Sequence, residues 1–201
     1  MQTIVPCLFF DGKAEEAVNF YKSVFKNAKV GHVSRYGDNM PMPHGSVMTA
    51  ELEIAGQKFL ALNGPPMFTF SPAISFMVNC ETQQDIDYYW DKLSDGGETQ
   101  QCGWLKDKFG LSWQIVPSEM PHLMGNASSA QSQKMMEAVM TMTKLDIAAL
   151  KQAYERAARN GLIHARRGRP LCPRLRHCMA PCRADDPPGG SRRNTANRLS
   201  R

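Results

Sequence analysis

The chain has 201 residues, of which 42% are hydrophobic, and a formal net charge of +5. This length suits one domain, or one domain with a tail, and the hydrophobic share is enough for a buried core. The charge is unevenly placed, because residues 1–158 carry −4 (13 basic and 17 acidic side chains) and residues 159–201 carry +9 (11 Arg and 2 Asp). A mildly acidic body lacks the basic surface that nucleic acids or anionic membranes require, so we expect neither as a partner.

Segments that direct a protein to or across a membrane are not recognised in the sequence. No apolar run approaches the ~20 residues of a membrane-spanning helix. The first residues, Met1-Gln-Thr, lack the basic start of a secretory signal. Cys7, Cys80 and Cys102 do not have the spacing of metal ligands. We therefore predict a cytoplasmic protein whose cysteines are free thiols.

The first 64 residues are predicted to form a strand, a helix and three further strands. Residues 3–10 are apolar on both sides of the strand, so both faces are expected to be buried. Apolar side chains then recur at i, i+3, i+4 and i+7, which predicts an amphipathic helix. Its buried stripe is Ala14, Ala17, Val18, Tyr21, Val24 and Phe25, and the three strands that follow are 28–36, 46–55 and 58–63.

The same order of elements returns after a linker of residues 64–72. A strand is predicted at 73–79 and a helix at 82–94, where Thr82 suits the N-cap and two glycines follow the last turn. Three more strands are predicted, at 98–102, at Trp104-Leu105 and at 112–116. The sequence therefore indicates two βαβββ units in tandem.

The last predicted strand carries the first candidates for binding. Trp113 and Ile115 point to one side of this strand and Gln114 to the other. A glutamine between two large apolar residues does not suit an ordinary core face. Gln114 is therefore a polar anchor in a cleft or is bonded to a neighbouring backbone, and Trp104 is a core residue or a stacking wall for a ligand.

A second group of candidates lies on the predicted strand 46–55. Thr49, Glu51 and Glu53 share one face of it. This face is either solvated or turned towards a cleft, where Glu51 would act as a catalytic base or bind a cationic ligand. Asn63 is a turn residue or a further ligand contact. The candidate ligand-binding residues are thus Glu51, Trp104, Gln114, Thr49 and Asn63, and Glu51 is the candidate for catalysis.

Helices are predicted after Pro117, and they are expected to pack across the body or against a partner subunit. One has a stripe of Met135, Met136, Val139 and Met142, and another is capped by Asp146. From residue 158 Arg, Pro, Gly and Cys dominate, which predicts a disordered tail over 158–201. The tail has no Lys, against 11 Lys in the body, so we interpret it as sequence from another reading frame or a fusion scar. Finding residues 170–201 in the natural protein would refute that hypothesis.

Several stretches of the sequence resemble one known family. They are VPCLFFDGKAEEAVNFYKSVF, MTAELEIAGQKFLALNGPP, CGWLKDKFGLSWQIVPSEM and KLDIAALKQAY. They resemble the PhnB-like branch of the vicinal oxygen chelate superfamily, which has the glyoxalase and bleomycin-resistance fold. Members of this branch often carry the label 3-demethylubiquinone-9 3-methyltransferase domain. The resemblance spans residues 1–157 and implies an α+β fold, in which paired βαβββ modules form a curved mixed sheet around a cleft. It also implies C-terminal helices and, commonly, a homodimer.

The resemblance further implies where a divalent metal would lie. In the superfamily the ligands are His or Glu at the start of each module's first strand, and Glu or Gln on each last strand. The equivalent positions here are Pro6, Ala73, a position near Ala61, and Gln114. Many relatives also have His where this chain has Thr49. Proline and alanine offer no side-chain ligand, and Zn²⁺ or Fe²⁺ needs about three ligands, so we expect no metal and no other cofactor.

Three hypotheses for the function follow. The first, which we prefer, is a protein that binds a small organic molecule in a cleft without the usual metal ligands, and not an enzyme. The second is a lyase, isomerase or dioxygenase of the glyoxalase class, which uses a metal or Glu51 as base. The third is a dimeric structural or interaction protein with a vestigial cleft. The methyltransferase label has no supporting motif, because no Gly-rich loop follows the first strand and no acidic residue is placed to hold a ribose.

Overall fold

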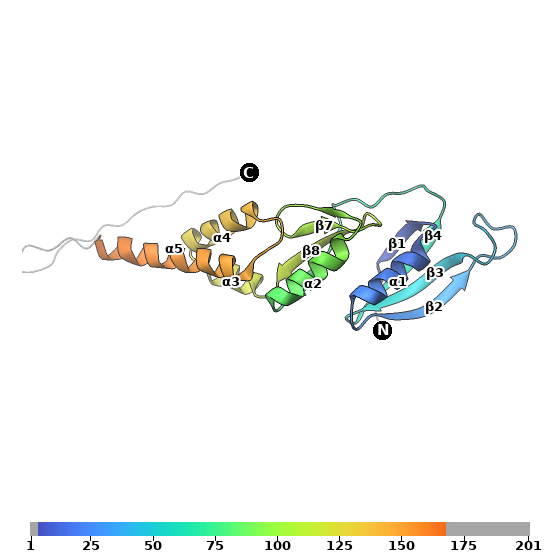
Figure 1. Cartoon of the computed structure of the whole chain (residues 1–201), viewed down its shortest axis with the longest axis horizontal. Coiled ribbons are helices and arrows are strands. Elements are labelled where there is room, and N and C mark those ends of the chain that lie inside the picture. The colour runs from blue at the N-terminus through green and yellow to red at the C-terminus, as the bar shows by residue number, and fades with distance from the viewer. Residues whose placement is uncertain (1–3, 168–201) are drawn as a thin grey trace, which may run out of the picture.

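The computed structural model describes residues 4–167 and shows an α+β fold with two units of the same design and a helical C-terminal part (Figure 1). The first module contains β1 (Cys7–Asp11), α1 (Ala14–Val24), β2 (Lys29–Arg35), β3 (Val47–Ile54) and β4 (Gln57–Gly64). The second module contains β5 (Ser75–Cys80), α2 (Gln83–Ser94), β6 (Glu98–Thr99), β7 (Trp104–Lys106) and β8 (Ser112–Pro117). The helices that follow are α3 (Met120–Asn126), α4 (Ser129–Thr141) and α5 (Ile147–Arg167).

Each module forms its own four-stranded mixed sheet. The strand orders are β1-β4-β3-β2 and β5-β8-β7-β6, so the two sheets have the same topology. The first strand of each module is parallel to the last one, and the other neighbours are antiparallel. The predicted βαβββ repeat is confirmed. It also leaves β1 and β5 as edge strands, which matters for the assembly proposed below.

Helix α1 forms where its apolar period predicts it. Ala14, Ala17, Val18, Tyr21 and Val24 are all buried, and they pack against the first sheet. Helix α2 buries a corresponding stripe, and it starts at a capping box in which Thr82 and Asp85 bond each other's backbone N–H. Both helices lie on one side of the sheets, which leaves the opposite face of each sheet for the candidate residues.

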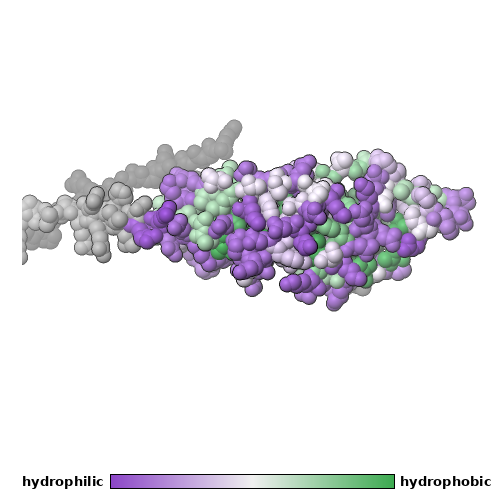
Figure 2. Space-filling view, in the orientation of Figure 1, coloured by the Kyte–Doolittle hydropathy of each residue, from purple (hydrophilic) through white to green (hydrophobic). Residues whose placement is uncertain are grey.

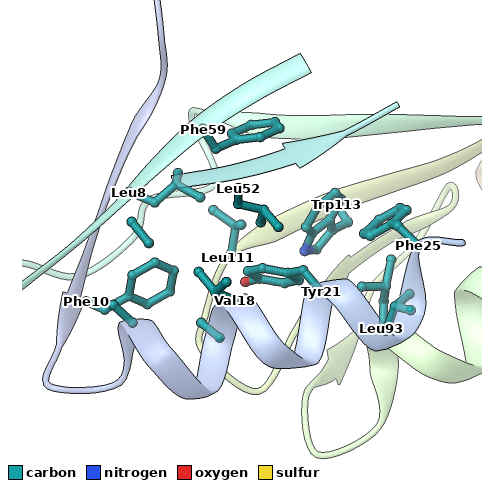
Figure 3. Packing of buried hydrophobic residues seen from close by; sticks show 14 of the residues in the cluster. Leu8, Phe10, Val18, Tyr21, Phe25, Leu52, Phe59, Leu93, Leu111 and Trp113 are labelled. Carbon is teal, nitrogen blue, oxygen red and sulfur yellow. The ribbon is translucent and has the colours of Figure 1, made fainter. Parts of the chain in front are cut away.

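One hydrophobic core joins the two modules (Figure 3). The ring of Trp113 from β8 lies between Tyr21 and Phe25 of the first module, with centroid distances of 5.7 and 5.5 Å. On the other side, Phe59 of β4 packs edge-on against Phe76 of β5 at 5.1 Å. Buried aromatic pairs of this kind stabilise a domain beyond the area that they bury, so the modules are held as one folded unit.

Two strand predictions differ from the structure. β1 is buried on only one face, because Cys7 and Asp11 are exposed and Phe9 is half-buried. The strand predicted at 98–102 ends at Thr99. The reason lies in the backbone: Cys102 has a φ of 63°, and its N–H donates to the carbonyl of Met142 rather than to a strand.

The C-terminal helices build a smaller core of their own around Met135, Leu145 and Leu150. Val116 of β8 packs against this cluster, so the helices are attached to the second module rather than to the first. Helix α5 continues to Arg167, beyond residue 158, where the tail was predicted to begin; residues 168–201 of that tail lie outside the described part. Within residues 4–167, no helix is both long and apolar enough to span a membrane.

Candidate functional site

Glu51 and Thr49 lie on the face of the first sheet that α1 does not cover. The exposed side chain of Glu51 crosses the neighbouring strand, where its Oε2 accepts a hydrogen bond from the backbone N–H of His32 at 3.4 Å. Gly31 makes room for it, because a Cβ at this position would lie 2.7 Å from the same Oε2. Thr49 forms a hydrogen bond of 2.5 Å between its hydroxyl and that of Ser34.

A hollow of about 490 Å³ on this sheet includes Glu51 in its lining, together with Lys29, Glu53 and Lys58. Lys29 and Glu53 form an ion pair at 3.9 Å across the hollow's rim. The hollow therefore holds charges of both signs on an exposed surface. A carboxylate in this position can contact a cationic group, while its role as a base stays a prediction.

Trp104 and Gln114 lie together on the open face of the second sheet. They are register partners on β7 and β8. The Gln114 amide donates to the hydroxyl of Ser75 on β5 at 2.8 Å, so its Nε2 is used. Among the described residues, nothing donates a hydrogen bond to Oε1 of Gln114 or accepts one from the Trp104 indole N–H. One acceptor and one donor are thus left for another molecule.

These two side chains line a groove of about 310 Å³ between the second sheet and the C-terminal helices. We call it the groove. The helices contribute mainly methionine and other apolar side chains, and β5 adds Met77. The complete lining is Met77, Cys102, Trp104, Gln114, Val116, Met120, Pro121, Met124, Met136, Val139 and Leu145.

Asn63 is placed differently from the other candidates, because its side chain is buried and fully used. Its Oδ1 accepts the backbone N–H of Ala14 at 2.7 Å, at the start of α1. Its Nδ2 donates to the carbonyl of Val47 at 2.8 Å. Asn63 therefore links β4, β3 and the first turn of α1. Of the five candidates, only Trp104 and Gln114 share one cavity, and Glu51 lines a separate one.

Sequence reasoning missed the most strongly bonded polar group in the core, Asp107. Its Oδ2 accepts the hydroxyl of Tyr21 at 2.7 Å and the indole N–H of Trp113 at 2.8 Å. Its Oδ1 accepts the backbone N–H groups of Phe109 and Leu111 at 2.9 and 3.0 Å. An Asp that bonds the backbone two residues on is a known turn device. That signal was present in Asp107-Lys-Phe-Gly110, but the partner in α1 could not be read from it.

Burial raises the pKa of both acidic groups of this cluster, the Asp107 carboxyl and the Tyr21 hydroxyl. Desolvation raises the pKa of the Asp107 carboxyl, and the hydrogen bonds from Trp113 and Tyr21 lower it, with desolvation the larger effect. Desolvation also raises the pKa of the Tyr21 hydroxyl, and the nearby Asp107 charge adds to this. Tyr21 therefore remains a donor at neutral pH. This cluster holds the modules together and does not open onto the groove.

A family comparison identifies the chain. The model of the 3-demethylubiquinone-9 3-methyltransferase family matches residues 2–116, which is more than half of the sequence. The chain belongs to this family. This is the family label that the sequence motifs predicted. No curated protein matches the chain.

The chain is also similar to several solved structures. A PhnB protein from Bacillus cereus is 39% identical, and the match covers 58% of this chain and 99% of that one with a TM-score of 0.55. A protein from Pseudomonas aeruginosa is 22% identical, covering 58% and 98% with a TM-score of 0.49. The fosfomycin resistance protein FosX from Listeria monocytogenes is 13% identical, covering 60% and 94% with a TM-score of 0.45.

The residues of this chain do not fit the divalent metal that the resemblance to the vicinal oxygen chelate superfamily implies. Ala61 is part of the core, and Pro6 and Ala73 have no ligating atom. The side-chain amide of Gln114 donates a hydrogen bond to the Ser75 hydroxyl. In the described part of the chain, no three His, Cys, Asp or Glu side chains gather in one place. Since a divalent metal needs about three ligands, we derive no reaction step through such an ion.

The methyltransferase in the family's name has no counterpart in the geometry of β1 and α1. The turn between them is Gly12-Lys13, with one glycine, whereas a dinucleotide- or nucleoside-binding turn has several. The name therefore describes the family and does not assign an activity to this chain.

Proposed function

We propose that the protein binds a small, largely apolar organic molecule in the groove, with Gln114 and Trp104 as its polar contacts. The observation that carries this proposal is a largely apolar cavity lined by Gln114 and Trp104, whose amide oxygen and indole N–H have no partner among the described residues. Ligand sites are typically apolar cavities with a few placed polar groups, and about 310 Å³ is at the lower end of their usual size.

The methionines of the groove support a ligand of variable shape. Met120, Met124 and Met136 come from α3 and α4, while Met77 faces them from β5. Methionine side chains are flexible and polarizable, so they adapt to different apolar surfaces. Met77 is 53% exposed and Met136 46%, which leaves the groove accessible from solvent. A neutral aromatic or branched aliphatic molecule with one hydrogen-bonding group fits this lining.

A thermal-shift screen of neutral aromatic and aliphatic compounds tests the proposal. A compound that binds the native state raises the melting temperature as its concentration exceeds Kd. The shift is expected to disappear in Gln114→Leu and Trp104→Ala and to persist in Gln152→Leu, which changes an exposed glutamine of α5. A screen without a stabilising compound, or shifts equal in Gln114→Leu and Gln152→Leu, would remove the groove as the site.

A homodimer and a cytoplasmic location complete the proposal. β1 and β5 are edge strands, and edge strands offer unpaired backbone groups to another chain. Ile74, just before β5, is 70% exposed, which favours a second copy as the partner there.

Cys7, Cys80 and Cys102 are free thiols, which suits a reducing compartment. Sedimentation of the wild type and of Ile74→Lys tests the dimer, and cell fractionation tests the location.

A further inference from the structure

A third cavity, of about 520 Å³, lies where the two modules meet. We call it the junction hollow. Its walls come from the end of β1, from residues 66–70 of the linker, and from the β6–β7 edge with the turn at Phe109-Gly110. In Figure 1 the linker between β4 and β5 crosses from one module to the other. The junction hollow shares no lining residue with the groove, so it is independent of the function proposed above.

Aromatic side chains form the apolar part of the junction hollow. Phe9 packs edge-on against Phe68 with ring centroids 5.2 Å apart, and Phe10 packs edge-on against Phe70 at 5.4 Å. Phe68 nevertheless remains 64% exposed and Met67 67%. The surface in the view of Figure 2 is otherwise largely hydrophilic, with separate hydrophobic patches. Large apolar side chains left exposed beside a cavity are a mark of ligand or partner contact.

Lys108 is the best neutralised of the three lysines that line the junction hollow. Its ammonium group forms an ion pair with Glu16 at 2.9 Å. It also lies over the rings of Phe20 and Phe109, at 4.9 and 5.1 Å from their centroids. A cation with one carboxylate and two aromatic faces has its charge satisfied. Lys108 therefore belongs to the wall and is not the group that would hold a ligand.

The other two lysines are poorly neutralised. Lys106 lies 3.7 Å from Glu98, which is longer than a hydrogen bond, and the Glu98 side chain is 70% exposed. Lys13 makes no ion pair with any residue in the range 4–167. Asp11 and Glu98 are the acidic groups of the lining. Because Glu16 already neutralises Lys108, the lining has no surplus of positive charge. The junction hollow instead places two poorly paired ammonium groups, Lys13 and Lys106, beside an aromatic wall.

We propose that the junction hollow binds an organic monoanion with an aromatic body. Its carboxylate or sulfonate lies between Lys13 of the first module and Lys106 of the second, and its ring packs against Phe9 and Phe68. An anionic group gives Lys13 an ion-pair partner and gives Lys106 a closer one than Glu98 at 3.7 Å, and charge-assisted hydrogen bonds to ammonium groups are among the stronger polar contacts. The linker carries the exposed face of the aromatic wall, so ligand contact buries Phe68.

The probe for the test is anilinonaphthalene sulfonate, an aromatic anion that fluoresces when it leaves water. Titration of the full chain gives its Kd, and competition then uses phenylacetate and its neutral analogue phenylacetamide. We expect phenylacetate to displace the probe and phenylacetamide not to, with competition that weakens as salt is added. Equal displacement by the two compounds would overturn the proposal, because the anion would then contribute nothing.

Matched variants locate the site. Lys13→Gln combined with Lys106→Gln is expected to weaken phenylacetate binding roughly tenfold or more. The control combines Lys22→Gln and Lys92→Gln, which remove two exposed lysines of α1 and α2 outside the junction hollow and should leave the affinity unchanged. Phe68→Ala is expected to weaken the probe several-fold. Equal effects of the two lysine pairs, or no effect of either, would contradict the proposal.

A last variant separates the junction hollow from the groove. Gln114→Leu should remove stabilisation by neutral compounds and leave the phenylacetate competition intact, since Gln114 does not line the junction hollow. If Gln114→Leu abolishes the competition while the Lys13 and Lys106 variant keeps it, the anion binds in the groove and the proposal fails. Failure of the neutral screen alone would leave the junction hollow unaffected.

Discussion

At the scale of single residues, Asp107 has the strictest hydrogen-bonding requirement of the buried side chains described above. Its carboxylate accepts four hydrogen bonds, and no cation contacts it among the described residues. An amide offers only one accepting oxygen, so in Asp107→Asn an NH₂ group must face either the two backbone donors or Tyr21 and Trp113. At least one buried N–H is then left without an acceptor. We expect a loss of about 1–3 kcal/mol in unfolding free energy, measured by urea denaturation.

Tyr21→Phe is the control for this prediction. It keeps the ring that packs against Trp113 and removes one of the four donors, so the expected cost is about 0.5–1.5 kcal/mol. Asp107→Ala, which leaves every donor unpaired, should cost more than Asp107→Asn. If Asp107→Asn were as stable as the wild type, the carboxylate would not be what joins α1 to the second module.

At the scale of elements, two capping boxes of different chemistry begin α2 and α4. Thr82 pairs with Asp85, and Ser128 pairs with Gln131. Replacing the hydroxyl residue by alanine should cost about 1 kcal/mol in either helix. The bond from the Thr82 hydroxyl, with that from its backbone N–H, lowers the pKa of Asp85, whereas Gln131 does not titrate. The two boxes should therefore differ in their response to acid.

The sign of this difference follows from the lowered pKa of Asp85. A depressed acid pKa stabilises the fold at pH values above the unfolded value of 3.8, and this stabilisation is lost as the pH falls through the folded pKa. The difference in unfolding free energy between wild type and Thr82→Ala should accordingly become smaller in acid. The corresponding difference for Ser128→Ala should stay constant. Urea unfolding at neutral pH and below pH 3.8 measures both, and parallel pH profiles would argue against the Asp85 contribution.

Elements with a strong local pattern were predictable from the sequence, and those decided by distant contacts were not. The apolar stripe of α1 and the N-cap at Thr82 need only neighbouring residues, and both are confirmed. The strand predicted at 98–102 shortens to Glu98–Thr99, because Cys102 bonds the carbonyl of Met142, 40 residues later. The alternation of Trp113, Gln114 and Ile115 is confirmed, with the aromatic and the isoleucine buried and the glutamine half-buried.

At the scale of the whole molecule, the groove and the junction hollow both depend on how separate parts of the chain meet. Trp104 and Gln114 were selected from the pattern of one strand, but the apolar side of the groove comes from α3 and α4. The junction hollow was not foreseen, because Lys13 and Lys106 come from different modules and meet only when the sheets pack through Trp113. Sequence periodicity describes one element at a time, so it identified Trp104 and Gln114 as wall residues of the groove without the cavity that they help to form.

Removing the C-terminal helices should abolish ligand binding in the groove and leave binding in the junction hollow intact. The core that joins the modules has no fully buried member beyond Ile115, while the helices have their own cluster. A chain ending at Ser118 is therefore expected to unfold in one cooperative transition, with a melting temperature lower by roughly 5–10 °C. The decrease reflects the lost bonds from Cys102 and Gly103 to the carbonyls of Met142 and Thr143.

The truncated chain should lose stabilisation by neutral compounds, because the helix wall of the groove is gone, and should keep the phenylacetate competition, because the junction hollow ends at Gly110. Val116 and Trp104 become exposed in this chain and would bind additional fluorescent probe. The readout is therefore only the probe fluorescence that phenylacetate displaces and that Lys13→Gln combined with Lys106→Gln removes. If the shortened chain does not fold, or if it keeps the neutral ligands, the helices have a different role from that of a groove wall. Sedimentation of the same chain shows whether the helices are also needed for assembly.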